Sequence, residues 1–511
     1  MKILIANRGE IAVRVIRACR EMGVPTVAVY SDCDRLSPHV AAADQAIAIG
    51  ASEAVRSYLD IGKIVDAARR AGADAVHPGY GFLAENAAFA SACRDAGLTF
   101  IGPSPEAIAL MGSKTEARAA AIRAGVPVVP GTERPFDASA SDGEIARAAE
   151  AIGYPLLVKA VAGGGGKGMR VVDARGDLAS AIARARSEAG AAFGDAAVYL
   201  ERRLTRPRHI EIQLLGDRDG TVVPFVEREC SIQRRHQKVV EESPSIAISR
   251  DLRERIAAAA KSVAQSVGYT NAGTIEFLVD RDDRGVDAFY FLEMNTRLQV
   301  EHPVTEMVTG VDLVQWQIRI AQGERLDLDP RGALTPRGHA IECRIYAEDP
   351  DRGFMPSPGV IRAFHPASGP GIRDDSGVTA GYTVPVYYDS MIAKLIAWAG
   401  TREAAIARMS RALAEYQVLG IRTTIPLFAW LMHQDDYRAA RYDTTWLDRV
   451  MAERARRQAS FNELDADEET LVTIASAIDA YLRARKGSAP ADAGFGMGAW
   501  QRTARSEALR E

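Results

Sequence analysis

The chain has 511 residues, a length that exceeds one ordinary hydrophobic core and predicts several domains. It is 47% hydrophobic and 25% charged with a net charge of -4, which is typical of a soluble globular protein and lacks the basic excess of nucleic-acid-binding proteins. Five scattered cysteines without a CxxC pair argue against a disulfide framework or a zinc site. The charged residues Arg8 and Glu10 come too early for a signal peptide, and no apolar run reaches about 18 residues, so we expect a cytoplasmic protein without a membrane span.

Residues 1–112 alternate short β-rich runs with helical patterns. A helix is predicted at 10–22 with Gly23 as its C-cap, and strands are predicted at 2–6, 26–30, 46–50, 73–77 and 98–101. This alternation is typical of a parallel sheet covered by helices, which predicts a Rossmann-like α/β domain. The first strand runs into Asn-Arg-Gly-Glu rather than G-x-G-x-x-G, so NAD binding is disfavoured.

Residues 113–334 carry most of the candidate chemistry, and about 130–203 are predicted to form a small separate lobe. The predicted strand 154–160 bears Lys159, and a second strand begins at Met169. Between them lie four consecutive glycines, Gly163, Gly164, Gly165 and Gly166. Such a run has a high conformational entropy and suits a mobile loop whose backbone N–H groups close over phosphate. A flexible hairpin tip is the alternative; a Walker A loop is disfavoured because Gly168 follows Lys167.

Two predicted strands bring carboxylates together. The first covers 273–279 and bears Glu276; the second ends at Glu293 and Asn295, which share a face because side chains alternate along a strand. The turn chemistry of residues 280–285 predicts that the two strands pair antiparallel. Apposed carboxylates with an amide oxygen beside them predict a magnesium site that also holds nucleotide phosphates. We expect the same alternation to continue through Arg297, Gln299 and Glu301 and to supply an anion-binding group and a base.

Upstream residues add further polar groups. His209, Glu211 and Gln213 alternate with apolar residues along one predicted strand, and residues 230–238 are rich in hydrogen-bond donors. So many donors require an anionic partner. A nucleic-acid patch is the competing interpretation, and it is disfavoured because the segment has no interleaved aromatic residues and the chain is net acidic.

The last part of the chain divides in two. Residues 335–447 are predicted to form a further α/β unit that begins with the strand 339–346 and bears Arg344. The tail 448–511 contains a predicted amphipathic helix at 467–486, with acidic residues at its start and basic residues at its end, followed by a Gly- and Ala-rich linker at 488–498.

Several motifs together resemble biotin carboxylase, an ATP-grasp enzyme. The resemblance covers about residues 1–447, and the motifs that carry it are 5–12, 77–86, 111–114, the glycine loop, 233–238, 293–303, 342–344 and 381–385. It implies a Rossmann-like N-terminal domain (1–112), an ATP-grasp domain of α+β character with a mobile lid (113–334) and a C-terminal biotin carboxylase domain (335–447). It also implies a homodimer, with Arg14, Arg17, Glu21 and Arg373 near its interface.

The resemblance further implies a role for each matched residue. ATP would be bound by the four loop glycines and by Lys114, Lys159, Met169, Glu201, Leu204, His209, Gln233, His236 and Leu278. Magnesium or manganese would be bound by Glu276, Glu293 and Asn295. Bicarbonate would be bound by Lys238, Arg297, Gln299 and Val300, and Glu301 would deprotonate it for attack on the γ-phosphate. Arg344 would stabilise the biotin enolate, with Tyr80 beside the ring.

The sequence departs from the family pattern in two places. The glycine loop opens Lys159-Ala160-Val161-Ala162 where the family often has Lys-Ala-Ser-Gly, and no Met-Lys-Met biotin-attachment motif is present. We therefore expect other chains to provide a biotin carrier protein and a carboxyltransferase subunit, and the tail helix either docks a partner or packs on its own domain. The function predicted is the first half-reaction of an acetyl-CoA or propionyl-CoA carboxylase. The alternatives are the biotin carboxylase component of a pyruvate carboxylase, another ATP-grasp ligase and a non-enzymatic nucleotide sensor.

Overall fold

The computed structural model describes residues 1–461 except 133, 138, 162–168, 194, 195, 282–286 and 458, and in the tail it describes 474, 477, 478 and 481. Two compact units are distinguished, Met1–Gln458 and Ala459–Glu511. The predicted glycines Gly163 to Gly166 and most of the tail lie outside the described residues. Within the described part, no helix has the length and apolar character needed to cross a bilayer.

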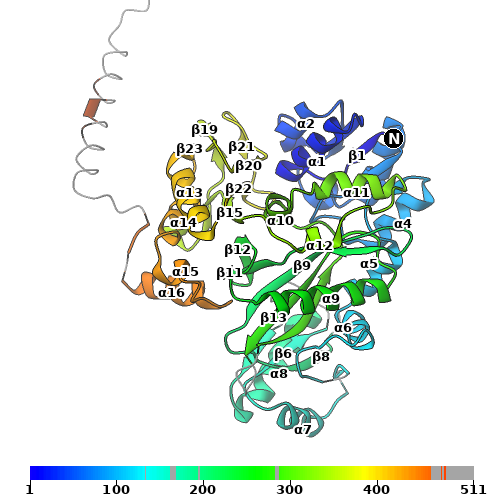
Figure 1. The fold of residues 1–511 in the computed structure, drawn as a ribbon, viewed down its shortest axis with the longest axis vertical. Helices are drawn as coiled ribbons and strands as arrows, with labels where there is room; N and C mark the ends of the chain where they lie inside the picture. Colours follow the sequence, from blue (N-terminus) through cyan, green and yellow to red (C-terminus); the bar gives the residue numbers. More distant parts are fainter. Residues whose placement is uncertain are drawn as a thin grey trace, which may run out of the picture. The chain divides into compact units, whose positions relative to one another are not determined.

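The first sheet, whose strand β1 is labelled in Figure 1, is parallel, as the alternation of strands and helices predicts. Its strand order is β3-β2-β1-β4-β5. The strands are β1 (Ile3–Ile5), β2 (Thr26–Ser31), β3 (Gln45–Gly50), β4 (Ala75–His77) and β5 (Thr99–Phe100). The helices are α1 (Gly9–Glu21), α2 (Pro38–Ala42), α3 (Ile61–Ala71) and α4 (Ala87–Asp95). All five predicted strands and the helix after the first strand are confirmed within two residues at each end.

The central sheet has nine strands and runs through the middle of the molecule (Figure 1). In spatial order its strands are β14 (Asp287–Asn295), β13 (Asn271–Arg281), β9 (Arg208–Gly216), β11 (Arg228–Arg234), β12 (Gln237–Ser243), β15 (His339–Tyr346), β22 (Met391–Ala399) and β20 (Ile372–Ser376), while β10 (Val222–Pro224) pairs with β9. Because β12 pairs with β15, backbone hydrogen bonding continues across the predicted boundary at residue 335.

The two faces of the central sheet have different environments. Ile210, Ile212 and Leu214 of β9 pack in one apolar cluster with residues of α9 (Arg250–Ser266). The alternating residues His209, Glu211 and Gln213 project from the other face and are buried. The remaining helices of this region are α5 (Pro105–Gly112), α6 (Lys114–Arg123), α10 (His302–Thr309), α11 (Leu313–Ala321) and α12 (Pro330–Ala333).

A smaller antiparallel sheet lies at the lower end of the molecule in Figure 1. It consists of β7 (Met169–Val172), β6 (Leu156–Ala160) and β8 (Val198–Arg202), covered by α7 (Asp142–Ile152) and α8 (Leu178–Phe193). The two strands predicted on either side of the glycine loop are confirmed, and Lys159 lies opposite Met169.

The C-terminal part adds α13 (Arg402–Glu415), α14 (Ile425–Leu431), α15 (Asp435–Arg438) and α16 (Trp446–Arg456). Its short strands are β16 (Glu348–Asp349), β17 (Met355–Pro356), β18 (Gly359–Val360), β19 (Ala363–His365), β21 (Thr383–Val384) and β23 (Gln417–Leu419). In the second unit the four described residues of the predicted helix 467–486 are helical and exposed.

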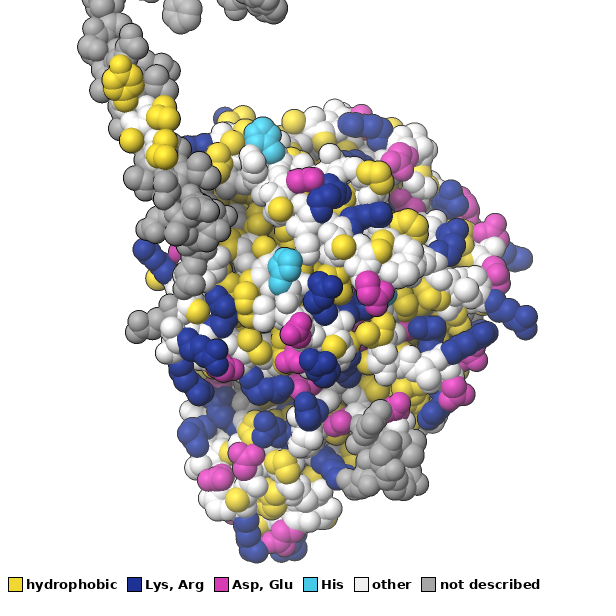
Figure 2. Space-filling view, turned by 60° about the vertical axis from the view of Figure 1, so that its left-hand side comes forward, with side chains coloured by type: hydrophobic (Ala, Val, Ile, Leu, Met, Phe, Trp, Pro, Cys, Tyr) yellow, Lys and Arg dark blue, Asp and Glu magenta, His cyan; other side chains and the backbone are white. Residues whose placement is uncertain are grey.

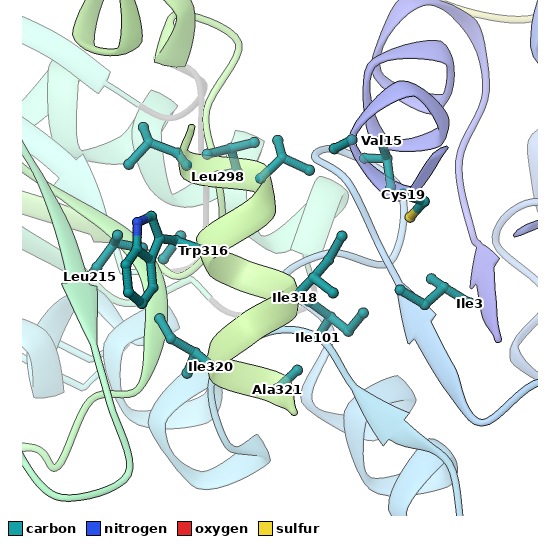
Figure 3. Close-up of a cluster of buried hydrophobic side chains, with 14 of the residues drawn as sticks. Ile3, Val15, Cys19, Ile101, Leu215, Leu298, Trp316, Ile318, Ile320 and Ala321 are labelled. Carbon is teal, nitrogen blue, oxygen red and sulfur yellow. The ribbon is translucent and has the colours of Figure 1, made fainter. Parts of the chain in front are cut away.

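Helix α11 joins the parallel sheet to the central sheet (Figure 3). Trp316 and Ile320 point toward Leu215 of β9, whereas Ile318 lies on the side that faces Ile3 and Ile101. All belong to one buried hydrophobic cluster. The helix therefore buries two sides at once, which fixes the first sheet against the strands that carry the polar face.

Replacing Ile318 by Ala is expected to lower the free energy of unfolding by about 2–5 kcal/mol, because a fully buried side chain between two sheets leaves a cavity. Urea denaturation followed by circular dichroism measures the change. Leu36→Ala is the control, since Leu36 is 90% exposed and its removal should have little effect. Equal losses in the two variants would contradict this packing of α11.

Candidate active site

The centre of the site is one lysine surrounded by carboxylates. Lys238 of β12 lies 2.5 Å from Glu211, 2.7 Å from Glu276 and 2.7 Å from Glu301. Burial alone lowers the pKa of an ammonium, but the three carboxylates hold the pKa of Lys238 well above its usual range. The four residues come from β12, β9, β13 and the loop before α10, so only the folded sheet brings them together.

A second cation lies beneath this group. Arg228 of β11 is fully buried and donates to Glu211, to Gln213 Oε1 at 2.9 Å and to Gln299 Oε1 at 2.8 Å. It also donates to the hydroxyls of Thr274 and Thr305. Through this hydrogen bond its guanidinium orients the side chain of Gln299, one of the predicted bicarbonate ligands.

Glu301 is held between two cations. Its Oε1 accepts from Lys238, and its Oε2 accepts from Arg344 Nη2 at 2.9 Å. Burial by itself raises a carboxyl pKa, but Lys238, Arg344 and Arg228 hold the pKa of Glu301 well below its usual range. Glu301 is therefore ionised at neutral pH, as a base must be to accept a proton. Arg344 also bonds Glu241, whose pKa is raised to about 7 by burial even though Arg344 opposes the shift.

The predicted metal ligands are also brought together. Glu276 and Glu293 are direct partners across the antiparallel pair β13–β14, and Asn295 Nδ2 donates to Glu276 Oε1 at 2.9 Å. Burial and the neighbouring Glu276 raise the pKa of Glu293, so a negative charge there lacks full compensation. A divalent cation between the two carboxylates would relieve that repulsion, and the oxygen donors fit magnesium.

Two other groups of potential metal ligands occur among the described residues, and within each group the ligand atoms lie within 4.8 Å of one another. One comprises His209, Glu211 and Glu276, and the other comprises Glu211, Cys230 and Glu301. In both groups Glu211 lies against the Lys238 ammonium. Glu276 also contacts Lys238, but its partner Glu293 forms no ion pair within 4 Å among the described residues and so remains available to a cation. The Glu276–Glu293 pair is the better metal candidate.

The prediction that strand alternation continues through Arg297, Gln299 and Glu301 is wrong. Strand β14 ends at Asn295, because its pairing with β13 ends at Thr274 opposite Asn295, and a loop follows. The three side chains converge by other contacts: Arg297 bonds Glu85 at 2.8 Å and Asn295 at 3.2 Å, while Gln299 Nε2 donates to Glu276 at 2.9 Å.

The residues predicted to bind nucleotide lie on both sides of this cluster. His209 Nε2 is 3.1 Å from Glu276, and Gln233 bonds the other ring nitrogen of His209. Lys159 forms a buried ion pair with Glu201 on the small sheet. Burial holds the pKa of Lys114 below its usual value, although nearby Glu293 opposes the shift. Leu278 is the cross-strand partner of His209.

The other predicted residues have looser positions. His236 is exposed in the turn between β11 and β12, and Leu204 is half-buried just after β8. Tyr80 packs against the hydrophobic cluster of α11, and its hydroxyl is buried without a hydrogen-bond partner among the described residues. Val300 lies in the loop beside Glu301.

Sequence reasoning missed the groups that hold this site together. It singled out Glu211 only as a polar residue of its strand, and it gave no role to Arg228, Glu241 or Glu85, which bind the candidate residues directly. A weak signal was present, since Phe225-Val226-Glu227-Arg228-Glu229 places charges inside an apolar run. Buried charges need partners, so such a run indicates a paired network, although the partners of Arg228 lie 15 to 77 residues away.

The surface differs from this interior. On the face shown in Figure 2, basic side chains are numerous and acidic side chains lie among them, with hydrophobic residues between. Exposed charges of this kind are screened by water and salt. In the buried cluster each cation instead has specific carboxylate partners, and there electrostatic interactions are much stronger.

Comparison with known proteins decides the family. Residues 1–108 match the family model "Biotin carboxylase, N-terminal domain", residues 113–329 match "Carbamoyl-phosphate synthase L chain, ATP binding domain", and residues 342–449 match "Biotin carboxylase C-terminal domain". A biotin carboxylase from Nostoc sp. is 53% identical over 449 residues, which cover 88% of this chain and 99% of the relative. The chain belongs to the biotin carboxylase family. It is thus an ATP-dependent ligase with the ATP-grasp fold, as predicted.

Solved biotin carboxylases share this fold. The enzyme from Campylobacter jejuni is 47% identical with a TM-score of 0.83, covering 88% of this chain and 98% of that one. The biotin carboxylase domain of Hydrogenobacter thermophilus 2-oxoglutarate carboxylase is 46% identical with a TM-score of 0.84, covering 91% and 99%. A pyruvate carboxylase subunit from Methanothermobacter thermautotrophicus is 47% identical over 498 residues, covering 95% of this chain and 99% of the relative.

Replacing Arg228 by Met is expected to lower the free energy of unfolding by about 3–5 kcal/mol, because it removes the cation from a buried ion pair and leaves several polar groups without a donor. Guanidinium denaturation measures the loss. Arg250→Met is the matched control: Arg250 pairs with Glu254 in a bridge whose arginine is 86% exposed, so its removal should cost little. A loss at Arg228 as small as that at Arg250 would contradict the view that the buried ion pairs of Arg228 stabilise the fold.

Proposed function

We propose that the chain carboxylates biotin, carried on a separate protein, using ATP and bicarbonate. The observation that carries the proposal is Glu301, an ionised buried carboxylate whose two oxygens are held by Lys238 and Arg344. Relatives support it: one solved biotin carboxylase is a complex with a β,γ-ATP compound, and another contains magnesium ADP and bicarbonate.

The residues would divide the reaction between two sides of the cluster. Lys238, Arg297, Gln299 and the Val300 backbone would hold bicarbonate, and Glu301 would remove its proton. The bicarbonate oxygen would attack the γ-phosphorus, and the bond from phosphorus to the ADP oxygen would break. Cations dominate the site because bicarbonate is a weak nucleophile and phosphoryl transfer develops charge that must be neutralised.

The second step would use the product of the first. Carboxyphosphate would break down to CO₂ and phosphate, phosphate would take the N1′ proton of biotin, and the biotin nitrogen would attack CO₂. Arg344 would stabilise the enolate form of biotin beside Tyr80. Because Arg344 and Lys238 share Glu301, the two steps would occur around one carboxylate.

The nucleotide would lie between the central sheet and the small sheet. Lys114 and Lys159, with the loop glycines Gly163 to Gly166, would hold the phosphates. The remaining contacts would come from Met169, Glu201, Leu204, His209, Gln233, His236 and Leu278. Glu276, Glu293 and Asn295 would hold magnesium or manganese, which neutralises phosphate charge when bound. The proposed domain limits are 1–112, 113–334 with the lid at about 130–203, and 335–447.

The final acceptor is proposed to be an acyl-CoA, with the carrier protein and carboxyltransferase on other chains in the cytoplasm. A 2-oxo acid acceptor is the second candidate, and one observation favours it: alignment with the Methanothermobacter pyruvate carboxylase protein covers 95% of the chain, whereas the Nostoc biotin carboxylase covers 88%. The longer alignment extends into the tail. Reconstitution with purified carboxyltransferase subunits, each supplied with acetyl-CoA, propionyl-CoA or pyruvate, distinguishes the two acceptors.

A homodimer is also proposed, because a related structure is described as a biotin carboxylase domain dimer. In this chain Arg14 and Arg373 both bind Glu306, at 2.9 and 2.7 Å. Two of the residues expected near the interface are therefore ordered by internal ion pairs before any partner binds.

ADP release by the purified chain with magnesium-ATP should require both bicarbonate and free biotin. Glu301→Gln is expected to lower the rate about 10²–10⁴-fold, because an amide cannot accept the proton. A coupled assay for ADP measures both. Turnover that ignores biotin would assign the chain to another ATP-grasp ligase, and nucleotide binding without turnover, with or without a carrier protein, would favour a sensor.

Replacing Lys238 by Gln should move the acid limb of the pH profile of kcat/KM for bicarbonate to higher pH. Activity requires ionised Glu301 and is lost as the pH falls through its pKa, which the wild type holds well below the usual range. The variant lacks one of the cations that hold it there. Initial rates between about pH 5 and pH 8 measure the shift. Lys63→Gln, on the surface, is the control, and an unmoved limb in Lys238→Gln would contradict the assignment.

A further inference from the structure

One fully buried lysine has no role in the proposed reaction. Lys394 of β22 donates from Nζ to the carbonyl oxygen of Val300 at 3.0 Å. The same ammonium is 3.2 Å from Glu10 Oε2 and 3.8 Å from Asp375 Oδ2, and it lies 5.7 Å from the centre of the Tyr80 ring. It therefore contacts the segment that bears the base and Glu10 of α1, and it lies near β20 and near the residue proposed to lie beside biotin.

The register of the sheet explains its position. Lys394 is the direct cross-strand partner of Arg344 on one side and of Asp375 on the other. Opposed residues of antiparallel strands project from the same face, so the two cations stand side by side. Arg344 binds the carboxylate of Glu301, and Lys394 binds the carbonyl of the preceding residue, Val300.

Like charges opposite each other destabilise a sheet unless anions compensate them. Arg344 is compensated by Glu241 and Glu301, and Lys394 is compensated by Glu10 and Asp375. Burial raises the pKa of Glu10 to about 7, an effect that Lys394 opposes from 3.2 Å. Lys394 is thus its direct cationic partner.

A close backbone approach brings Glu10 to this lysine. A Cβ atom on Gly377, which follows β20, would lie 2.4 Å from the backbone nitrogen of Glu10 and 2.6 Å from the carbonyl carbon of Gly9. Only glycine permits this contact between the start of α1 and the end of β20. The first sheet is thereby connected through one ammonium to the segment that holds bicarbonate.

We propose that Lys394 is a positioning residue that fixes the Val300–Glu301 segment for bicarbonate binding and links it to α1 through Glu10. The inference rests on the proposed function. Lys394 does not touch the reactants; its hydrogen bond sets where the Val300 backbone and the Glu301 carboxylate stand, so its loss should weaken bicarbonate binding more than ATP binding.

The test uses Lys394→Met and the double variant Glu10→Gln/Lys394→Met, in which the carboxylate left without its lysine is also neutralised so that the protein is more stable. The reference for the double variant is Glu10→Gln alone. Relative to that reference, the KM for bicarbonate should rise about tenfold, the effect of losing one hydrogen bond, while the KM for ATP changes less than about twofold. Lys394→Arg keeps a positive charge and N–H donors, so it should keep the KM for bicarbonate within about threefold of the wild type.

Three outcomes would overturn the inference. These are an unchanged KM for bicarbonate, a parallel rise in both KM values, and a fall in melting temperature as the sole effect. Lys63→Met, a surface lysine, controls for loss of positive charge. The bicarbonate dependence of wild-type turnover is measured first. If wild-type turnover does not depend on bicarbonate, the proposed function itself is overturned. If it does, and the Lys394 variants keep the wild-type KM for bicarbonate, only the role of Lys394 is overturned.

Discussion

The structure depends on a buried group of carboxylates on one face of the central sheet whose negative charges are balanced by buried cations. Glu211, Glu276 and Glu301 lie around the ammonium of Lys238, and the buried guanidinium of Arg228 also pairs with Glu211. Removing charges from water is costly unless each has an opposite partner and satisfied hydrogen bonds. The pairing lets a carboxylate stay ionised in a protected interior, which is the state that a base for bicarbonate requires.

The continuity of the sheet makes this compensation possible. Strands β9, β11, β12, β15 and β22 are neighbours although they span residues 208 to 399, so a row of polar side chains crosses the boundary between two predicted domains. On β9 the opposite face is apolar and packs in one cluster with residues of α9. Catalytic groups on strands are positioned more accurately than groups on loops, and the loop from Arg297 to Glu301 is fixed by bonds to those strands.

Much of the fold and of the candidate site follows from local patterns. The five parallel strands, the hairpin that apposes Glu276 with Glu293 and the strand that bears Arg344 were all predictable, because alternation and turn residues act over a few neighbours. The geometry of Arg297, Gln299 and Glu301 was not, because strand alternation holds only while a partner strand supplies hydrogen bonds. The partners of the candidate site residues, such as Arg228 and Glu241, were missed because nothing in their local sequence indicates the distant group that each binds.

The sequence by itself determined the family, the residue types of the site and the order of its elements, since these are written in short motifs and in the period of the apolar residues. The tertiary structure alone decided which charges meet. That Lys238 joins three carboxylates, that Arg344 and Lys394 stand on neighbouring strands, and that Gly377 allows α1 to reach that pair are consequences of strand register and close packing. Register is set by the whole sheet, and a one-residue slip would send each of these side chains to the opposite face.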